Sequence, residues 1–589
     1  MAPMTFRPFV VSLSSLAALS GWAFGLEATG VVFHDVNGDG VRQQSEPGLG
    51  GVAVSDGRTV VRTDRAGRYR MEIDPDDAIV FVVKPKGFQV PLDGVNIPRG
   101  YYIHKPGGSP DDGFVFNGVA PTGPLPDAID FPLTLSEESN EFTVIAFGDP
   151  QPYSLEEVDF FRRDVVDPLI TSRGNVHGAA FGISLGDLVG DNLDLFDPLN
   201  QAQALFGVPW YNVYGNHDMN FLSGSSSLTS DDPDRYADET FERVYGPPNY
   251  AFQYADVHFI VLDNVYYQGF NGYRSRPDPN WPRAQKPVTN NYRGALLPAQ
   301  IEFVENYLKG VPPDELIVLA FHIPIEMHGE GVHRIPEKSD LFRALSGHPH
   351  TLSVSGHTHF QQHWFFGRDD GYAPAMSGGV NQHTRRDPER FPLPVHHHIN
   401  AVTASGSWYN GMPDEAGLPH TTMRDGSPNG YTLLHFDGNR YTSDFVAARR
   451  PRDDRMSIFI GSPETEGVIA RRSNGSARLA VNIYNGASGD EVLARIVPNP
   501  STLAESTPWR PLEFTPGLDP RFVSTHARES ELPDEFRSKW SLPQPQVNRH
   551  LWAGDLPRKL PVGTHIVEVQ HTDLYGRVSV NRRTLRVVD

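Results

Sequence analysis

The stretch WYNVYGNHD, residues 210–218, is the part of the sequence that decides the fold prediction. It begins as a short aromatic and β-branched strand, stops at Gly215 and then presents Asn216, His217 and Asp218. Open α/β sheets place their chemistry at the carboxyl ends of their strands. Asparagine, histidine and aspartate suit a metal centre better than a hydrophobic core, although an ordinary Asn/Asp turn would use the same residues.

Four other apolar strands of the sequence also end in side chains that bind metals. They are residues 142–147, followed by Asp149 and Gln151; residues 179–185, followed by Asp187; residues 316–321, followed by His322; and residues 351–355, followed by His357 and His359. Residues 156–170 have helical spacing of apolar positions between the first two strands. This alternation of strand and helix predicts an α/β domain, and chance placement of five such strand ends is improbable.

The composition limits the kinds of site that the chain can form. The 589 residues include 72 acidic and 51 basic side chains, a net charge of −21, and no cysteine. The negative balance disfavours a nucleic-acid surface but permits one small anionic group held at a metal. Without cysteine, disulfides and thiolate zinc sites are excluded, so metal ligands must be His, Asp, Glu, Asn or Gln.

The first residues are typical of a secretory signal. Residues 1–25 hold Arg7, a short apolar run at residues 10–19 and small residues at Ala23 and Gly25. The run is too short to span a membrane comfortably, and a buried N-terminal helix is the alternative. No later segment approaches a membrane span, so we expect an exported protein, periplasmic or secreted, without a transmembrane anchor.

A calcium-loop pattern follows the signal. The spacing of the EF-hand loop is matched by Asp35, Asn37, Asp39, Val41 (through its backbone carbonyl) and Glu46, with Gly40 at the sharp turn. The flanking segments read as strands rather than helices, which resembles the B-type repeat domains of bacterial surface adhesins. The loop therefore predicts a structural calcium ion, and an acidic turn that needs no ion is the alternative.

The chain divides into a signal and three predicted domains. Residues 26–137 form an N-terminal β-sandwich domain, residues 138–450 the α/β domain, and residues 451–589 a C-terminal β-sandwich domain with no cluster of ligand residues. Residues 252–254 and 258–263 predict a hairpin of a second sheet layer within the α/β domain.

The five strand ends, taken in order, closely resemble the calcineurin-like metallophosphoesterase superfamily. The motifs are DPQ at 149–151, GDLVGD at 186–191, GNHD at 215–218, His322 and GHTH at 356–359. Residues 241–250, 406–411 and 419–431 resemble one exported bacterial branch, whose members carry β domains on both sides of the phosphoesterase core. The resemblance implies a core of two packed sheets between helices, an αββα sandwich flanked by two β-sandwiches.

The resemblance also implies a centre of two divalent ions. Asp149, Gln151, Asp187 and His359 would hold one ion, and Asp187, Asn216, His322 and His357 the other, with Asp187 bridging. A metal-bridging hydroxide would attack phosphorus in line. His217 would contact the phosphate or protonate the leaving oxygen, with Asp218 orienting its ring.

One ligand position departs from the commonest family pattern, which is Asp-x-His where this chain has Asp149-Pro150-Gln151. An amide oxygen is a harder and weaker ligand than imidazole, so we expect a labile first site that favours manganese over iron or zinc. Asp191 is expected to support a ligand or cap a helix rather than bind metal. His396, His397 and His398 could touch a metal, but a solvated loop is the favoured reading.

These observations predict an exported metal-dependent phosphoesterase acting on a small phosphomonoester or phosphodiester. A nucleotide or sugar pyrophosphatase is one alternative. A non-catalytic surface-binding protein on the same fold is another, and the intact ligand set argues against it. The β domains offer a possible contact with a cell surface or carbohydrate.

Overall fold

The computed structural model describes residues 25–172, 176–327, 334–471, 478–497, 505–533, 541–557 and 560–589. The predicted signal, apart from Gly25, lies outside the described residues. Within these ranges, no helix combines the length and the apolar character that crossing a membrane requires.

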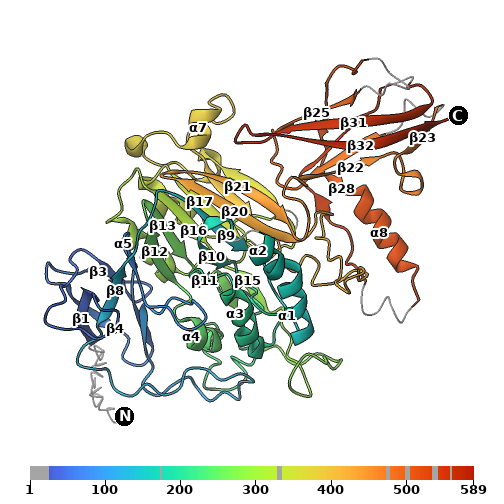
Figure 1. The fold of residues 1–589 in the computed structure, drawn as a ribbon. Coiled ribbons are helices and arrows are strands. Elements are labelled where there is room, and N and C mark those ends of the chain that lie inside the picture. Colours follow the sequence, from blue (N-terminus) through green and yellow to red (C-terminus); the bar gives the residue numbers. More distant parts are fainter. Residues whose placement is uncertain are drawn as a thin grey trace, which may run out of the picture.

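Two mixed sheets form the centre of the molecule (Figure 1). The first has the order β11-β10-β9-β20-β21, with β9 (Glu141–Phe147), β10 (Ala179–Ser184) and β11 (Trp210–Asn212) parallel, and β20 (Gly430–Asp437) and β21 (Arg440–Ala447) antiparallel additions. The second has the order β12-β13-β16-β17-β19-β18 and consists of β12 (Tyr250–Tyr254), β13 (Val257–Val261), β16 (Leu316–Ala320), β17 (Thr351–Ser355), β18 (Gln362–Phe366) and β19 (His396–Asn400). The four central strands of this second sheet run parallel.

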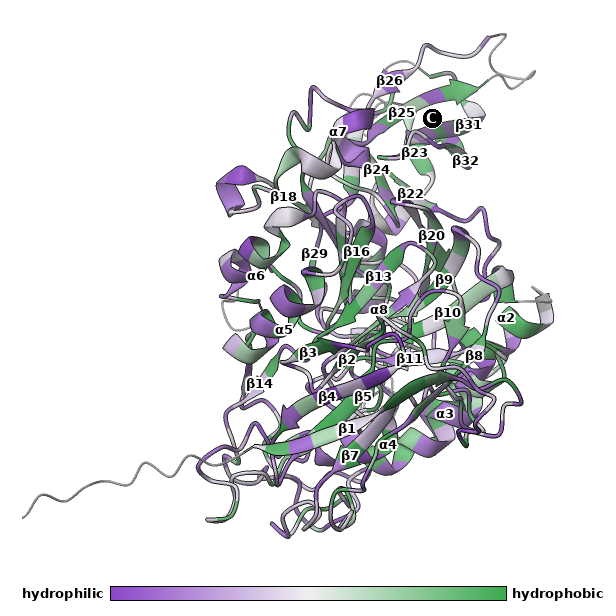
Figure 2. Ribbon diagram, turned by 90° about the vertical axis from the view of Figure 1, so that its left-hand side faces the viewer, coloured by the Kyte–Doolittle hydropathy of each residue, from purple (hydrophilic) through white to green (hydrophobic). Residues whose placement is uncertain are grey.

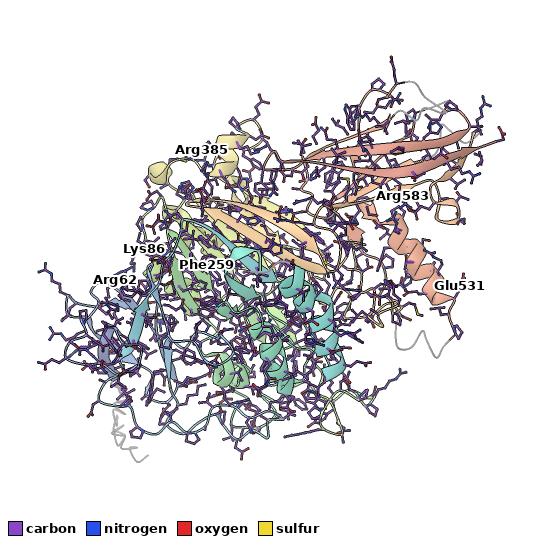
Figure 3. The ribbon with its side chains drawn as sticks, in the orientation of Figure 1. Arg62, Lys86, Phe259, Arg385, Glu531 and Arg583 are labelled. Atoms are coloured by element: carbon purple, nitrogen blue, oxygen red, sulfur yellow. The ribbon has the colours of Figure 1, made fainter. Side chains whose placement is uncertain are left out.

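The two sheets pack face to face over a buried apolar layer. Val144 and Ile183 from the first sheet and Phe259 and Val318 from the second belong to one buried cluster. The strands β13 and β16 are coloured mainly as hydrophobic in Figure 2, as expected for parallel strands covered on both faces. Phe259, labelled in Figure 3, lies in the middle of this arrangement.

Helices cover the outer face of each sheet. On the first sheet they are α1 (Leu155–Phe161), a π-helical turn (Arg162–Val166), α2 (Asp167–Ser172), α3 (Phe196–Ala204) and α4 (Glu239–Tyr245); on the second they are α5 (Pro298–Leu308) and α6 (Lys338–Ala344). The short helix α7 (Gln382–Arg386) and the hairpin of β14 (Val265–Tyr267) and β15 (Tyr292–Gly294) lie in connecting loops. This confirms the predicted αββα sandwich, including its second sheet layer.

The N-terminal domain is built from two four-stranded sheets. One has the order β4-β1-β8-β6 and comprises β1 (Leu26–His34), β4 (Arg68–Ile73), β6 (Phe88–Gln89) and β8 (Phe131–Leu135). The other has the order β3-β2-β5-β7 and comprises β2 (Ala53–Ser55), β3 (Val60–Arg62), β5 (Ala78–Val82) and β7 (Tyr101–His104). Buried apolar residues such as Val32, Val54 and Val80 fill the space between them.

The C-terminal domain is a second sandwich. Its sheets are β22-β24-β30-β27 and β23-β32-β31-β25-β26, formed by β22 (Met456–Ile460), β23 (Val468–Ala470), β24 (Arg478–Ile483), β25 (Glu491–Val497), β26 (Arg510–Pro511), β27 (Glu513–Phe514), β30 (Leu551–Asp555), β31 (Gly563–Thr572) and β32 (Val578–Val588). The pair β28 (Gly517–Leu518) and β29 (Val547–Asn548) and the helix α8 (Pro520–Ser530) lie beside it. The core is therefore flanked by β domains on both sides (Figure 1).

Candidate metal centre

The turns that follow the parallel strands gather at one edge of the two sheets. Five of the seven predicted ligands have left-handed backbones: Asp149 (φ 43°), Gln151 (φ 41°), Asp187 (φ 47°), His357 (φ 77°) and His359 (φ 56°). A left-handed conformation costs energy in a residue with a Cβ atom, and such residues collect at functional sites. Here the conformation turns polar side chains back towards the strand ends.

Asp187 is the centre of the site. Its Oδ2 lies 3.2 Å from His322 Nε2 and 3.4 Å from Gln151 Nε2, and its Oδ1 accepts a hydrogen bond from the His217 amide at 2.8 Å. Ligand atoms of Asp187, His322 and His357 all lie within 4.8 Å of one another. In the part of the chain that the structure describes, no other three His, Asp or Glu residues converge in this way.

The four residues predicted for the second metal position lie together. Asn216 Oδ1 is 3.0 Å and His357 Nδ1 is 3.2 Å from His322 Nε2. The His322 Nδ1–H donates to the Leu185 carbonyl at 2.8 Å, so the Nε2 atom faces this group. Holding one ring nitrogen on a protein acceptor while the other faces the centre is the usual arrangement of a metal-binding histidine.

The first metal position is assembled beside it. Asp149 accepts the His357 amide at 3.0 and 2.9 Å, and His359 Nε2 lies 3.6 Å from Asp149 Oδ1. The His359 Nδ1–H donates to the Gly406 carbonyl at 2.6 Å. Gln151 is fully buried, yet its Oε1 has no hydrogen-bond partner. A buried acceptor without a partner is costly, and a cation at this position would satisfy it.

Burial and neighbouring charges shift several pKa values in the site. Burial raises the pKa of Asp149 to about 7 and lowers the pKa of His359 to about 3, so the His359 ring is neutral, as a ligand must be. Burial alone would raise the pKa of Asp187 as well, but His322 and His217 outweigh it and hold that pKa well below its usual range. All seven residues predicted as ligands thus meet at one place, and their donor atoms fit divalent cations.

The structure corrects the predicted partner of His217. Its Nδ1 lies 2.6 Å from Asp191 Oδ1, and its side chain is 21% exposed. Asp218 makes no contact with this ring. It accepts the amides of Gly215, Leu188 and Val189 at 2.9, 3.1 and 3.2 Å. The prediction that Asp218 orients His217 was therefore wrong, because three backbone donors of the β10 and β11 turns already use its oxygens.

Lys286 is a member of the site that the sequence did not reveal. Its Nζ lies 2.5 Å from Asp191 Oδ2 and 2.7 Å from Asp278 Oδ2, and the residue is only 2% exposed. His217, Asp191 and Lys286 thus form a continuous chain of contacts. Asp191 belongs to the GDLVGD motif and could have been found from it, whereas Lys286 comes from a loop without any motif.

An aromatic wall closes one side of the centre. The Trp408 ring lies 4.2 Å from the His359 ring, and the Arg424 guanidinium lies 5.8 Å above the Trp408 ring. The neighbouring Tyr409 donates its hydroxyl to the Pro150 carbonyl at 2.5 Å, which ties this segment to the first metal position. Trp408 and Tyr409 both have left-handed backbones, at φ 56° and 53°.

The other two predicted clusters differ from the centre. His396, His397 and His398 form the fully buried strand β19, so the solvated loop expected for them is wrong. In the loop after β1, Asp35 accepts the Gly38 and Gly40 amides at 2.7 and 2.8 Å, and Glu46 accepts the Val36 amide at 2.9 Å. These bonds are compatible with the ion-free acidic turn, and calcium binding at this loop stays a prediction.

The fold and the site together define a metallophosphoesterase. Models of three parts of one family match: calcineurin-like phosphoesterase over residues 136–361, its N-terminal part over residues 35–118 and its C-terminal part over residues 398–578. The chain belongs to the calcineurin-like phosphoesterase family, with the N-terminal and C-terminal domains of that family around the core. Membership in this family implies divalent metal ions.

Solved structures show more distant likenesses. A dimetal phosphatase from Danio rerio is 15% identical, with 51% of this chain and 98% of that chain covered and a TM-score of 0.30. The purple acid phosphatase PPD1 from yellow lupin seeds is 11% identical, with 67% and 71% covered and a TM-score of 0.32. PhoD is also 11% identical, with 67% and 78% covered and a TM-score of 0.32. No curated protein matches the chain.

Proposed function

We propose that this protein hydrolyses a small phosphomonoester or phosphodiester at a centre of two divalent ions. The observation that carries the proposal is the convergence of Asp187, His322 and His357 beside the unpartnered Oε1 of Gln151. Their ligand atoms lie within 4.8 Å of one another, a spacing that one divalent ion can bridge.

Seven residues would hold the ions. Asp149, Gln151, Asp187 and His359 suit one position, Asn216, His322 and His357 suit the other, and Asp187 is placed to serve both. When bound, two such ions supply Lewis-acid charge and an activated water for attack on phosphorus. Because Gln151 offers an amide oxygen where imidazole is commoner, we propose that manganese is favoured over iron or zinc at the first position.

His217 is the residue of the site best placed to act on the substrate. Asp191 fixes its Nδ1 at 2.6 Å, so the remaining ring nitrogen is the one available to a ligand, and the side chain is 21% exposed. A histidine held in this way can donate a hydrogen bond or a proton to the leaving oxygen. Asp218 contributes by holding the β10 and β11 turns together.

Trp408 and Arg424 would shape the entrance for the substrate. Arg424 supplies a positive charge beside the aromatic wall, and guanidinium groups bind phosphate oxygens in pairs. Hydrolysis of a nucleotide or sugar pyrophosphate needs the same centre with a larger leaving group, so it stays the second candidate. The non-catalytic alternative requires that the complete ligand set have no catalytic use.

We also propose that the protein is exported, since residues 1–25 have the pattern of a signal. Contact of the flanking β domains with a cell surface or carbohydrate is part of the same proposal. N-terminal sequencing of the protein recovered from its native compartment tests the signal directly. A mature chain that begins near Leu26 is expected, and a chain that retains Met1 in the cytoplasm would contradict export.

Rates on chromogenic phosphate esters test the activity. The protein is stripped with EDTA and assayed on nitrophenyl phosphate and bis-nitrophenyl phosphate with Mn²⁺, Zn²⁺ or Fe²⁺ added back. We expect activity only with added metal, highest with Mn²⁺, and none in the Asp187→Asn variant. Undiminished hydrolysis in the stripped protein, or in that variant, would overturn the proposal.

A further inference from the structure

A second, strongly acidic pocket lies between the N-terminal domain and the core. It has a volume of about 410 Å³, and eight of its lining residues are Asp or Glu whereas one is basic. Asp74 and Asp77 come from the turn between β4 and β5; Asp234, Asp238 and Asp263 come from the core. In Figure 1 the blue strands of the N-terminal domain lie at the left of the core, and α4 lies at the lower part of the core.

The basic residues around the pocket are already engaged. Lys105 Nζ lies 3.0 Å from Asp77, 2.9 Å from Glu239 and 2.5 Å from Glu242. Arg235 lies 2.9 Å from Asp77 and 3.5 Å from Asp74. Five lining carboxylates stay outside these ion pairs in the described part of the chain, and three of them, all from the core, are buried or fixed by backbone hydrogen bonds.

Those three carboxylates are Asp234, Asp238 and Asp263. One oxygen of Asp234 accepts the Tyr267 amide at 2.6 Å, and one of Asp263 accepts the Val265 amide at 2.8 Å, which fixes both side chains. Asp238 is only 9% exposed, lines the pocket, and its Oδ1 has no hydrogen-bond partner. A buried carboxylate oxygen without a hydrogen-bond partner destabilises the folded state, and a bound cation would offset that free-energy cost.

The charge of the pocket agrees with this geometry. Burial and the neighbouring Glu242 raise the pKa of Asp238 well above its usual range. Burial and the neighbouring Asp232 raise the pKa of Asp234 to about 7. Lys105 and Arg293 act in the opposite direction without restoring the usual values, so a bound cation would favour the ionised form of both carboxyl groups.

We propose that this pocket binds a small organic cation of the linear diamine or polyamine class. A chelated metal ion needs its oxygens within about 4.8 Å of one another, twice a metal–oxygen bond. Among the described residues, only the Asp187 group meets that spacing. The volume falls in the range of small-molecule sites, about 300–1,000 Å³. Ammonium groups at the two ends of one chain can reach separate carboxylates, and each group carries three N–H donors.

Such a ligand would contact both domains at once. It would bridge Asp74 and Asp77 of the N-terminal domain to Asp238 and Asp263 of the core, and so stabilise their docking. Because a ligand that binds only the folded state raises the unfolding temperature, binding has a readout that needs no catalysis. Failure of this proposal is therefore distinguishable from failure of the proposed phosphoesterase activity.

Titration calorimetry and thermal unfolding of the full chain with 1,4-diaminobutane and spermidine test the proposal. We expect one site per chain, a rise in Tm of about 2 °C or more at saturation, and no effect of the uncharged 1,4-butanediol. Asp238→Asn and Asp263→Asn keep the shape and should each weaken binding about tenfold or more. Asp340→Asn, on the exposed face of α6, is the matched control and should bind as the parent does.

The variants also provide a check on folding. The Tm of the free Asp238→Asn protein should be unchanged or higher, because the buried Asp238 carboxyl leaves its Oδ1 without a hydrogen-bond partner and lies beside Glu242. Asp263→Asn replaces it as the test variant if Asp238→Asn does not fold. Three results would overturn the proposal: no heat or Tm shift with either amine, equal binding by Asp238→Asn or Asp263→Asn and the parent, or a response to Ca²⁺ alone.

Discussion

Two groups of buried histidines lie in the core, and they use their ring nitrogens differently. In the metal centre, His322 and His359 each donate Nδ1–H to a backbone carbonyl and present Nε2 to other ligand atoms. In strand β19, His396 bonds the hydroxyls of Ser353 and Thr351 through its two nitrogens, at 2.7 and 2.8 Å. His398 in the same strand likewise bonds Ser353 and Ser355, at 2.7 and 3.2 Å.

Burial does not separate these groups, because His322, His396 and His398 are all 0% exposed and His359 is 2% exposed. The two groups differ instead in the conformation of their backbone. The ligand histidines at residues 357 and 359 sit on left-handed turns beyond a strand end, whereas residues 396–398 continue a strand within the sheet. A buried histidine is thus a candidate ligand when one nitrogen faces other metal-type side chains, as His322 Nε2 faces Asp187 and Asn216, and a packing residue when both nitrogens bond hydroxyl groups.

The largest expected effect is on catalysis. Asp187→Asn removes the charge that both metal positions share while keeping the shape of the side chain. We expect kcat to fall by more than about 100-fold, with little change in the unfolding temperature. This loss is larger than the one expected when a residue that only hydrogen-bonds a metal ligand is replaced. Nitrophenyl phosphate turnover and circular dichroism on the same preparation measure both. Activity of Asp187→Asn within tenfold of the parent would contradict a catalytic metal centre at Asp187. The distinction between metal-binding and packing histidines would then fail.

Asp191→Asn should have the next largest effect. It removes the charge that fixes His217 Nδ1, and we expect kcat to fall about 10–100-fold with the metal content unchanged. Asp218→Asn is the matched comparison. It lies next to His217 in sequence but bonds backbone amides, so its main effect should be on stability. If a fully folded Asp218→Asn protein lost more of its kcat than Asp191→Asn, Asp218 would be the partner of His217, as predicted from the sequence.

His398→Ala should affect stability and leave the metal centre intact. It removes a buried ring and leaves Ser353 and Ser355 without that partner, so we expect a loss of about 2–5 kcal/mol in the free energy of unfolding. His359→Ala is the counterpart, and it should lose metal instead. Chemical denaturation and metal analysis of both variants distinguish a loss of stability from a loss of metal. Loss of metal from His398→Ala would show that β19 supports the centre directly.

Acid should unfold the core through His396 and through two further histidines, His363 and His383. Burial lowers the pKa of His396 and His383 to about 3 and of His363 to about 4. Their unfolded pKa is about 6.5. Below that value the unfolded chain binds more protons, so stability is fully present above pH 6.5 and is lost as the pH falls towards the folded values. Each histidine contributes about 1.4 kcal/mol per pH unit to this loss.

Urea denaturation between pH 7 and pH 5 measures the slope. His363→Gln should reduce this slope by the contribution of one histidine. A slope that His363→Gln does not alter would mean that other groups cause the acid sensitivity.

The sequence was informative where short motifs end apolar strands. Each of the five strand ends carries its ligands within a few residues, so the order of motifs predicted both the two-sheet core and the seven residues that meet there. It was less informative where partners come from distant segments. Lys286 reaches Asp191 from a long loop, and Asp218 differs from Asp191 only in what surrounds it.

Strand β19 shows the limit most clearly. HHHIN has neither the alternation nor the apolar run of a typical strand. Its polar residues are stable there because the register places His398 opposite Ser353 and Asn400 opposite Ser355 on β17. Such pairing across two strands is invisible in either strand alone.

The smallest expected effect is on metal affinity at the first position. Gln151→His replaces the amide by the commoner imidazole and should slow metal loss to EDTA, with a modest effect on rate. Metal released against time from the parent and the variant gives the comparison. Faster loss from Gln151→His would contradict the assignment of Gln151 as a weak ligand.

The number of metal ions per chain tests the central claim most directly. Elemental analysis of the protein after reconstitution with Mn²⁺, set beside Asp187→Asn and His398→Gln, gives the count. The structure predicts two ions per chain in the parent and in His398→Gln, and fewer than one in Asp187→Asn. Equal metal content in all three proteins, or none in the parent, would contradict a centre built on Asp187.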